Sequence, residues 1–449
     1  MITKLKISIA LLIAAAMFSA ASGQTFDKAK LDQFFDRLAE KNKAMGSVAV
    51  VKDGSIVYSR AIGYSQINGA EKTQLTTVNR FRIGSITKLF TATMVLQLVE
   101  AKKLKLTDTL DKFFPQVPNA LKITIAQILA HRSGIHDSII DPKMRQASRA
   151  DAVSKDELLA LVTKGTPDFE PDARQRYSNS GYFLLGLVIE KVTGKPYEKV
   201  LAEKITSKIG LKDTYMATGN IDLSKNEALT YMFLGEWKPV PETHPTNLFG
   251  GGAIISTPTD MAKFIQALFD GKLVSSESLT LMKTVRDGDD MGVAMEPFTF
   301  AGRTFYGHTG GADNYGAWLA YLPEEKLAVA YTTNAKVYPV KDILSGVVDI
   351  YYGRPFQVPT FEAFAVSTET LDKYVGVYST PGAPVKLTIT RKGSTLFFQP
   401  PGEQSAAQLE AIAENKFQIE GAVVIEFDAA KSQMTVRRRG GERVFTKDK

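Results

Sequence analysis

Cysteine is absent from this sequence of 449 residues. Without cysteine the chain can form no disulfide, and it offers no cysteine for lipid attachment behind a leader segment. The fold must therefore be held by its packed core. The composition suits this, since 44% of the residues are hydrophobic and 23% are charged, and the length predicts about three domain-sized units.

The sequence also lacks a strong excess of one charge. Removing the first 23 residues, which contain Lys4 and Lys6 and no acid, lowers the formal charge from +7 to +5. The basic residues are spread along the chain, and we interpret the run Arg437-Arg438-Arg439 as a solvated strand edge. We therefore expect no nucleic-acid partner. Internal repeats are lacking too, which disfavours a solenoid or scaffold.

A long hydrophobic run is missing as well. The N-terminal apolar stretch covers only Ile7 to Phe18, follows two lysines and is followed by small residues up to Gly23. A helix of this length reaches about 18 Å, against about 30 Å for the hydrocarbon core of a bilayer. The pattern is typical of a cleaved signal peptide over residues 1–23. We expect a periplasmic or secreted protein with no stable membrane anchor after cleavage.

Periodicity divides the remaining chain into strands and helices. Val48 to Val51 and Ile56 to Tyr58 predict a hairpin around Asp53-Gly54. Residues 104–282 are mainly helical in pattern, and strand character returns over 303–333 as a meander. From about residue 371, short alternating strands with turns predict a small all-β domain. The predicted division is a main domain over 24–352, a linker over 353–370 and a β domain over 371–449.

Ser85-Ile86-Thr87-Lys88 begins the first strongly apolar helix. A spacing of three residues places the lysine amine over the same helix face as the serine hydroxyl. A lysine that is buried can lose its proton near neutral pH and then activate the hydroxyl as a nucleophile. A Ser-x-x-Lys match alone is equally compatible with a helix-capping serine and a surface lysine.

Two further segments carry chemistry in the same order along the chain. In Tyr177-Ser178-Asn179, the alternation places the phenol and the amide on one side, where nearby cations would lower the tyrosine pKa for acid–base work. In Gly307-His308-Thr309-Gly310-Gly311, the glycines permit a substrate to pair along a strand edge and a main-chain N–H to point at an oxyanion. Each segment alone also fits an ordinary helix start or bulge.

Taken together, these segments resemble one family over residues 35–352: serine β-lactamases of the class C type, D-alanyl-D-alanine carboxypeptidases and related esterases and D-amino-acid amidases. The stretches that carry the resemblance are 81–88 (FRIGSITK), 128–134 (ILAHRSG), 177–181 (YSNSG), 250–252 (GGG) and 308–310 (HTG). The resemblance implies an α+β fold, in which an antiparallel sheet flanked by helices meets a helical subdomain at the active site. The C-terminal β domain resembles modules appended to D-aminopeptidases.

The resemblance also implies roles for individual residues. Ser85 would form an acyl-enzyme, and Lys88 with Tyr177 would move protons to activate first Ser85 and then water. Asn179 would bind the substrate amide carbonyl. The strand residues that would line the bound substrate are His308, Thr309 and Gly310. The main-chain N–H groups of Ser85 and Gly311 would form the oxyanion hole.

Several residues depart from the family pattern or compete for a role. Class C β-lactamases usually carry lysine at the position of His308, so histidine here would be a weaker, pH-dependent cation for a substrate carboxylate. Asp172 replaces a common glycine, and we expect only a loop difference. The family match places His131 away from the nucleophile in a structural role. His136 and His244 show no metal-ligand spacing, so we expect neither a metal nor a cofactor.

Three functions remain open at this stage. The first is a hydrolase of D-amino-acid peptides or amides, including cell-wall stem peptides and other peptidoglycan fragments, which the His-Thr-Gly triplet favours. The second is hydrolysis of other acyl compounds, either small esters or β-lactams. The third is a catalytically silent binding protein that keeps the fold, which is disfavoured because every expected catalytic side chain is present.

Overall fold

The fold was analysed in a computed structural model of the full chain. It describes residues 26–140, 150–362, 364–381, 383–399, 406–419, 423–438 and 441–448. The expected signal peptide over residues 1–23 lies outside the described residues. Among these residues, no helix is long and apolar enough to cross a membrane.

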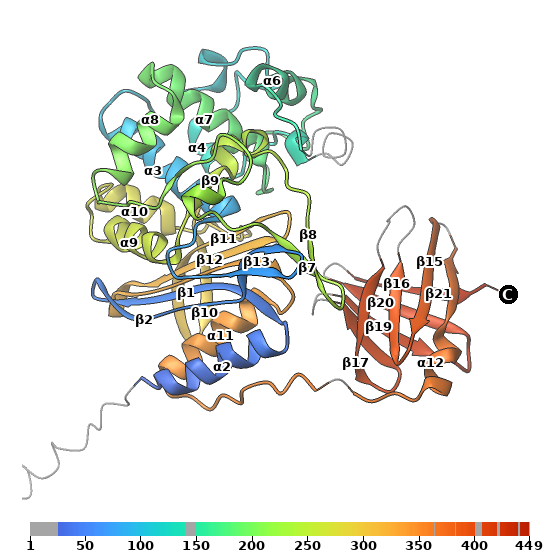
Figure 1. Ribbon diagram of the computed structural model, residues 1–449. Coiled ribbons are helices and arrows are strands. Elements are labelled where there is room, and N and C mark those ends of the chain that lie inside the picture. The colour runs from blue at the N-terminus through green and yellow to red at the C-terminus, as the bar shows by residue number, and fades with distance from the viewer. Residues whose placement is uncertain are drawn as a thin grey trace, which may run out of the picture.

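A six-stranded antiparallel sheet forms the centre of the main domain, in the order β10-β11-β12-β13-β1-β2 (Figure 1). Its strands are β1 (Ala44–Lys52), β2 (Ser55–Ile62), β10 (Glu296–Phe300), β11 (Arg303–Ala312), β12 (Tyr315–Leu322) and β13 (Leu327–Lys336). The predicted hairpin and meander are confirmed, and Asp53 and Gly54 both have the positive φ angles of a tight turn. β1 pairs with β13, so the two ends of the main domain meet in one sheet.

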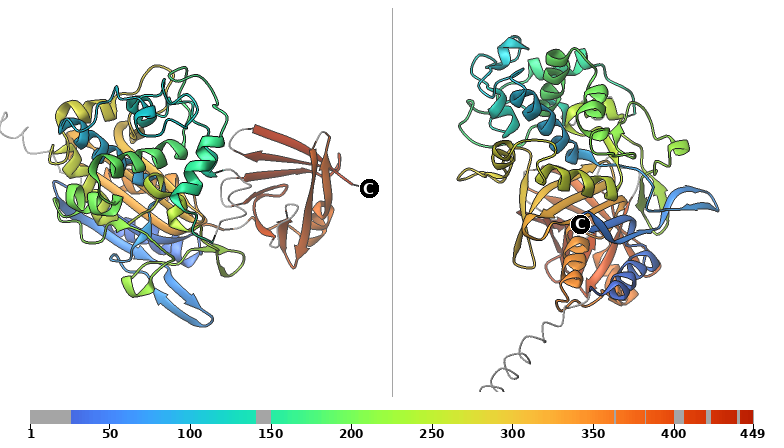
Figure 2. Two further views of the ribbon diagram at one scale, coloured as in Figure 1. Left: turned by 90° about the horizontal axis from the view of Figure 1, so that it is seen from above. Right: turned by 90° about the vertical axis from the view of Figure 1, so that its left-hand side faces the viewer.

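Helices cover both faces of this sheet (Figures 1 and 2). One face carries α2 (Lys28–Glu40) and α11 (Val340–Tyr351), whose apolar sides share a core with β1 and β13. The other face carries α9 (Pro258–Phe269) and α3 (Thr87–Glu100). α3 is buried on nearly all sides, so its apolar residues are spread around its circumference together with the buried polar residues Thr87, Lys88, Thr91 and Thr93. It follows a 3₁₀ turn over Gly84–Ile86, so Ser85 precedes the α-helix itself.

The helical subdomain lies between the N-terminal and C-terminal halves of the sheet in sequence. Its α-helices are α4 (Ile125–Leu129), α6 (Lys155–Lys164), α7 (Asn179–Thr193), α8 (Tyr197–Leu201) and α10 (Ser276–Lys283). Short strands β5 (Phe81–Arg82), β9 (Ile254–Ser256) and β6 (Tyr215–Met216) form a second sheet beside the site, and β3 (Tyr64–Asn68) pairs with β4 (Glu71–Gln74). β7 (Tyr231–Phe233) and β8 (Trp237–Pro239) form a separate hairpin.

Asp172 is more than a loop difference. Its φ angle of +70° lies in the left-handed region that favours glycine, but its carboxylate accepts hydrogen bonds from Arg132 at 2.8 Å and Arg286 at 2.6 Å. Arg132 is largely buried and also forms an ion pair with Asp289. The carboxylate therefore offsets backbone strain by holding together three segments below Tyr177.

The C-terminal region is an eight-stranded closed antiparallel barrel with one helix, α12 (Thr368–Tyr374). The barrel strands are β14 (Gly376–Thr380), β15 (Ala383–Lys392), β16 (Thr395–Gln399), β17 (Ala407–Ala413), β18 (Lys416–Ile419), β19 (Val423–Asp428), β20 (Gln433–Arg438) and β21 (Gly441–Lys447). Its interior is packed with its own apolar core. The expectation of a small all-β domain is confirmed. A long connection from α11 places the barrel beside the main domain (Figure 2).

Two glycines allow β11 to lie directly against the turn that carries Ser85. A methyl group at Gly310 would lie 2.0 Å from the carbonyl oxygen of Ile83, and one at Gly84 would lie 2.5 Å from the main-chain nitrogen of Gly311. Gly84 also has a φ of +51°. Only glycine fits this backbone-to-backbone approach without displacement of one segment.

Gly310→Ala should therefore destabilise the main domain, because β11 must move away from Ile83. We expect the free energy of unfolding to fall by about 2 kcal/mol or more, because a side chain added to a fully packed site typically destabilises a protein by an amount of this order. Urea unfolding of the two proteins measures this difference. The control is Gly219→Ala, at a glycine with no heavy atom within 4 Å of an added methyl group. Equal stabilities of the two variants would contradict the close-approach interpretation.

Candidate active site

Ser85 lies in the 3₁₀ turn before α3, at the junction of the sheet and the helical subdomain. Its side chain borders two cavities of about 320 and 1220 Å³. The first is lined by Ser85, Ile139, Ile140, Asn179, Leu248, Gly311 and Lys336, among others. The second includes Ser85, Tyr177, Glu296, Phe298, His308, Thr309 and Trp318. A substrate thus reaches the hydroxyl from open space on both sides.

Lys88 is completely buried one turn below the hydroxyl. Its Nζ lies 3.2 Å from Ser85 Oγ, 2.8 Å from Asn179 Oδ1 and 2.7 Å from the carbonyl oxygen of Gly251. Burial lowers the pKa of this amine from 10.5 to about 7, while Asp137 and Glu296 oppose part of that shift with their negative charges. A substantial fraction of Lys88 is therefore neutral at neutral pH.

The three neighbours of Lys88 match the hydrogen-bonding capacity of a neutral amine. Two N–H groups can donate to Asn179 Oδ1 and the Gly251 carbonyl, which only accept. The nitrogen lone pair is then left for the Ser85 hydroxyl. This arrangement directs the basic electron pair at the proton that a nucleophilic serine must lose. The Gly250-Gly251-Gly252 run thus supplies a carbonyl acceptor, a role that its glycines alone did not indicate.

Asp137 is a residue of the site that the sequence analysis did not assign. Its carboxylate accepts from Asn179 Nδ2 at 2.9 Å and from the main-chain N–H of Ser180 at 3.0 Å. The first contact fixes the orientation of the Asn179 amide, so that its oxygen faces Lys88. One N–H of the amide remains for a substrate carbonyl. No local pattern marks Asp137, because its partner lies 42 residues further along the chain.

Tyr177 lies above Lys88 and hydrogen-bonds with Ser85. Lys88 Nζ is 4.7 Å from the centre of its ring. Burial raises the pKa of the phenol well above its ordinary value of 10. The expectation that nearby cations lower this pKa is wrong, because desolvation outweighs the hydrogen bond with Ser85, which acts in the lowering direction. Tyr177 is therefore a protonated hydrogen-bond donor at neutral pH.

His131 lies closer to the site than expected. Its ring stacks on Tyr177 with centroids 4.4 Å apart, and its Nδ1 accepts from the Ser178 N–H at 3.1 Å. Burial, and secondly the charge of Lys88, hold the pKa of His131 well below its ordinary value of 6.5. A neutral ring fits the accepting Nδ1. The ring therefore has the expected structural role: it supports Tyr177 and is not among the residues that line the two cavities at Ser85.

The His-Thr-Gly stretch lies on β11, opposite Tyr177 across the second cavity. His308 is 1% exposed, and burial lowers its pKa to about 3. It is therefore neutral at physiological pH, and the expectation of a pH-dependent cation is wrong. Glu296 from β10 lies 3.5 Å from both His308 Nδ1 and Thr309 Oγ1. The sequence analysis also missed this carboxylate, which belongs to the neighbouring strand.

Gly84 lies close to Gly311, and Gly310 lies close to Ile83, so the main-chain nitrogen of Gly311 lies next to the turn that carries Ser85. The structure thus brings together Ser85, Lys88, Tyr177, Asn179, His308, Thr309, Gly310 and Gly311 at one site. His136 instead hydrogen-bonds with Asp168 at 3.0 Å, and His244 hydrogen-bonds with Thr246. Within the described ranges, no three His, Asp or Glu side chains are grouped as a metal site would need.

Comparison with known proteins agrees with this geometry. A family model described as Beta-lactamase matches residues 31–345. Among curated proteins, the chain is similar to "Penicillin-binding protein 4*" of Bacillus subtilis (strain 168), with 27% identity over 433 residues, which are 90% of this chain and 95% of that protein.

Solved structures show the same likeness. A D-stereospecific amidohydrolase from Streptomyces sp. has a TM-score of 0.62 and 26% identity, covering 72% of this chain and 98% of its own. An octameric penicillin-binding protein homologue from Pyrococcus abyssi has a TM-score of 0.63 and 24% identity, covering 94% of this chain and 100% of its own. The second likeness concerns the fold and extends into the barrel. The chain therefore belongs to the Beta-lactamase family and is a serine hydrolase with the fold of β-lactamases and penicillin-binding proteins.

Proposed function

We propose that this serine hydrolase cleaves D-amino-acid peptides or amides, including cell-wall stem peptides, through an acyl-enzyme on Ser85. The observation that carries the proposal is the placement of Lys88, whose buried amine lies 3.2 Å from the Ser85 hydroxyl. The other two neighbours of this amine, Asn179 Oδ1 and the Gly251 carbonyl oxygen, are both hydrogen-bond acceptors. The proposed route needs no metal or cofactor, because an amine with a pKa of about 7 can accept the serine proton near neutral pH.

Acylation begins when neutral Lys88 takes the proton of Ser85 and the oxygen attacks the substrate carbonyl. The main-chain N–H groups of Ser85 and Gly311 stabilise the resulting oxyanion. The leaving nitrogen must gain a proton as the carbon–nitrogen bond breaks. Tyr177 is the donor next to Ser85, and Lys88 returns the proton to the phenol oxygen. The amine product leaves, and Ser85 carries the acyl group as an ester.

Deacylation repeats these steps with water in place of the serine hydroxyl. Lys88, neutral again, accepts a proton from water directly or through Tyr177, and hydroxide adds to the ester carbonyl. Collapse of the intermediate returns a proton to Ser85 Oγ and releases the carboxylic acid. Asn179 has one amide N–H left for the acyl-side carbonyl, since Asp137 takes the other.

The charges around β11 support a peptide or amide with an uncharged group beside Thr309. His308 is neutral and Glu296 is close to both His308 and Thr309, so His308 offers no cation to a substrate carboxylate. The lysines that line the same cavity are Lys336 and Lys341. The amide class also agrees with the similarity to a D-stereospecific amidohydrolase. A second candidate is ester hydrolysis, which the apolar side chains of Phe298, Phe300 and Trp318 in the same cavity favour.

We also propose that the enzyme acts outside the cytoplasm, in the periplasm or as a secreted protein. The proposal rests on the lysines and the apolar run of residues 1–23. N-terminal sequencing of the protein recovered from the producing cell tests it. A new N-terminus between residues 21 and 25 is expected, and an intact Met1 in the cytoplasmic fraction would contradict export.

Ser85→Ala should abolish acylation, because the alanine has no oxygen to attack the substrate. Intact-protein mass spectrometry after mixing with benzylpenicillin should find an adduct, or rapid release of hydrolysed drug, with the original enzyme only. A panel of a D-alanyl-D-alanine peptide, D- and L-phenylalanine amide and p-nitrophenyl acetate then identifies the substrate. Turnover of the D compounds supports the proposal, whereas turnover of the ester alone makes the enzyme an esterase. Turnover that survives Ser85→Ala would overturn the mechanism.

Asp137→Asn should move the acid limb of the kcat/KM profile to lower pH. The Asp137 carboxylate raises the pKa of Lys88, so removing its charge lowers that pKa and leaves more neutral amine at pH 6. We expect a displacement on the order of one pH unit. The maximal rate should fall about tenfold, because Asn179 loses a charged acceptor.

The matched control is Asp168→Asn. Asp168 pairs with His136 and Arg176 on the same side of the molecule, and neither Asn179 nor Lys88 is its partner among the described residues. Its loss should leave the acid limb in place even if stability falls. If the acid limb of the kcat/KM profile stays in place in Asp137→Asn, or moves equally in both variants, the proposed influence of Asp137 on the pKa of Lys88 is refuted.

A further inference from the structure

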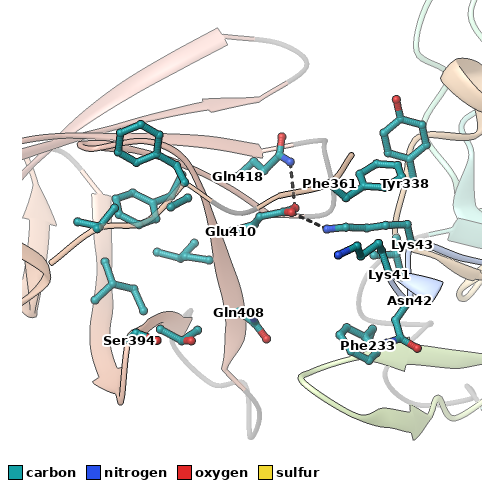
Figure 3. A pocket seen from close by; sticks show the side chains of 18 of the residues that line it. Lys41, Asn42, Lys43, Phe233, Tyr338, Phe361, Ser394, Gln408, Glu410 and Gln418 are labelled. Carbon is teal, nitrogen blue, oxygen red and sulfur yellow. Dashed lines mark hydrogen bonds and ion pairs between the residues drawn. The ribbon is translucent and has the colours of Figure 1, made fainter. Parts of the chain in front are cut away.

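A further cavity, distinct from the two at Ser85, lies between the barrel and the main domain (Figure 3). Its volume is about 690 Å³, within the range of about 300–1000 Å³ that is common for small-molecule sites. The main domain contributes the segment from Lys41 to Lys43, Phe233 and the segment from Val337 to Pro339. The barrel contributes β16, β17 and the start of β18. Its described lining shares no residue with the two cavities at Ser85.

One end of this cavity is apolar and reaches the barrel interior. Four of its lining residues also belong to the barrel core, namely Leu371, Leu396, Leu409 and Phe417. Phe364 adds an aromatic ring from the connection before α12 and is 49% exposed. Phe361 of the same connection lies instead beside Lys43, whose Nζ is 5.5 Å from the centre of its ring. An exposed ring next to the core of a closed barrel is apolar surface that a hydrocarbon chain would remove from water.

The other end is polar and holds two lysines, Lys41 and Lys43, and two carboxylates, Asp342 and Glu410. Lys43 forms an ion pair with Glu410 at 2.6 Å, and Gln418 donates to the same carboxylate at 3.1 Å (Figure 3). Asp342 lies in the first turn of α11, where the helix N-terminus stabilises a negative charge. Lys41 has neither form of compensation: its amine has no carboxylate partner within the described ranges, and it comes from the same wall as Lys43 (Figure 3).

We propose that this cavity binds a single-chain amphiphile with an anionic head. The hydrocarbon chain lies against Phe364 and the apolar barrel end, and the carboxylate or phosphate of the head pairs with Lys41. The site goes beyond the proposed hydrolase function and does not depend on it. It combines the two features of a small-ligand site, a mainly apolar wall and a few polar groups that fix orientation.

Trp237 provides a direct reporter of binding. Its ring packs on Phe233 with centroids 4.9 Å apart, and its Nε1 donates to Asn42 at 3.1 Å. Phe233 and Asn42 both line the cavity. The chain has two tryptophans, so Trp318→Phe leaves Trp237 as the single tryptophan. Its fluorescence is followed while the full-length protein is titrated with dodecanoate, kept below the concentration at which micelles form.

A saturable change with dodecanoate is expected, together with a much weaker response to dodecyl maltoside, whose head is neutral, and to dodecyltrimethylammonium, whose head is cationic. Lys41→Glu, added to the Trp318→Phe protein, should weaken dodecanoate binding about tenfold or more, since it replaces an attractive charge by a repulsive one. Lys103→Glu is the matched control, because it makes the same charge change at an exposed residue outside the cavity.

Thermal unfolding of each variant verifies that it is folded before titration. Three results would overturn the proposal: no saturable response, equal affinity for all three amphiphiles, or equal weakening by Lys41→Glu and Lys103→Glu. The readout does not involve Ser85 chemistry. A failed hydrolase assay and a failed titration are therefore separate outcomes.

Discussion

The buried amine of Lys88 is the constraint on which the rest of the site depends. A lysine with no exposed surface can stay charged only at a high desolvation cost, and the fall of its pKa from 10.5 to about 7 corresponds to roughly 5 kcal/mol against the ammonium form. The fold accepts this cost because Asn179 at the start of α7 and the carbonyl of Gly251 provide acceptors around the nitrogen. A neutral amine then satisfies those acceptors with two N–H bonds and keeps its lone pair for Ser85.

Two anions limit how far this pKa falls. Asp137 lies in the loop after α4 and Glu296 lies on β10, and both favour the charged amine. With desolvation alone the amine would be a weaker base, and with closer anions it would remain protonated at neutral pH. The balance leaves the amine with a pKa of about 7, so the proposed proton transfer could proceed in both directions near neutral pH. The sheet and the helical subdomain each supply one of the two charges.

The sequence predicted the parts of this arrangement that are local. Ser85 and Lys88 are three residues apart, and Tyr177 and Asn179 are two apart, so helix and loop geometry are enough to pair them. The non-local partners could not be predicted from spacing. Asp137 meets Asn179, the Gly251 carbonyl meets Lys88, and Glu296 meets Thr309 only when distant segments pack together.

The same limit applies to charge states and to the barrel. Residue type suggested a cationic His308 and a tyrosine of lowered pKa, but burial reverses both expectations, and burial depends on the whole fold. Alternating strands predicted a small β domain, whereas closure requires β14 to pair with β21, 60 residues or more apart in sequence. The roles of the individual site residues remain predictions of the resemblance and the geometry.

The main domain needs glycine where its two halves meet, and this links folding to chemistry. Gly84 and Gly310 let the backbone of β11 touch the turn of Ser85, so the N–H of Gly311 and the nucleophile belong to one rigid unit. A pair of donors held by main-chain contacts loses little entropy when an oxyanion forms between them, which is the physical basis of preorganised stabilisation. Side-chain donors on flexible loops would have to be ordered at that moment. In the proposed oxyanion hole, the two glycines would contribute through the absence of a side chain that would separate the two segments.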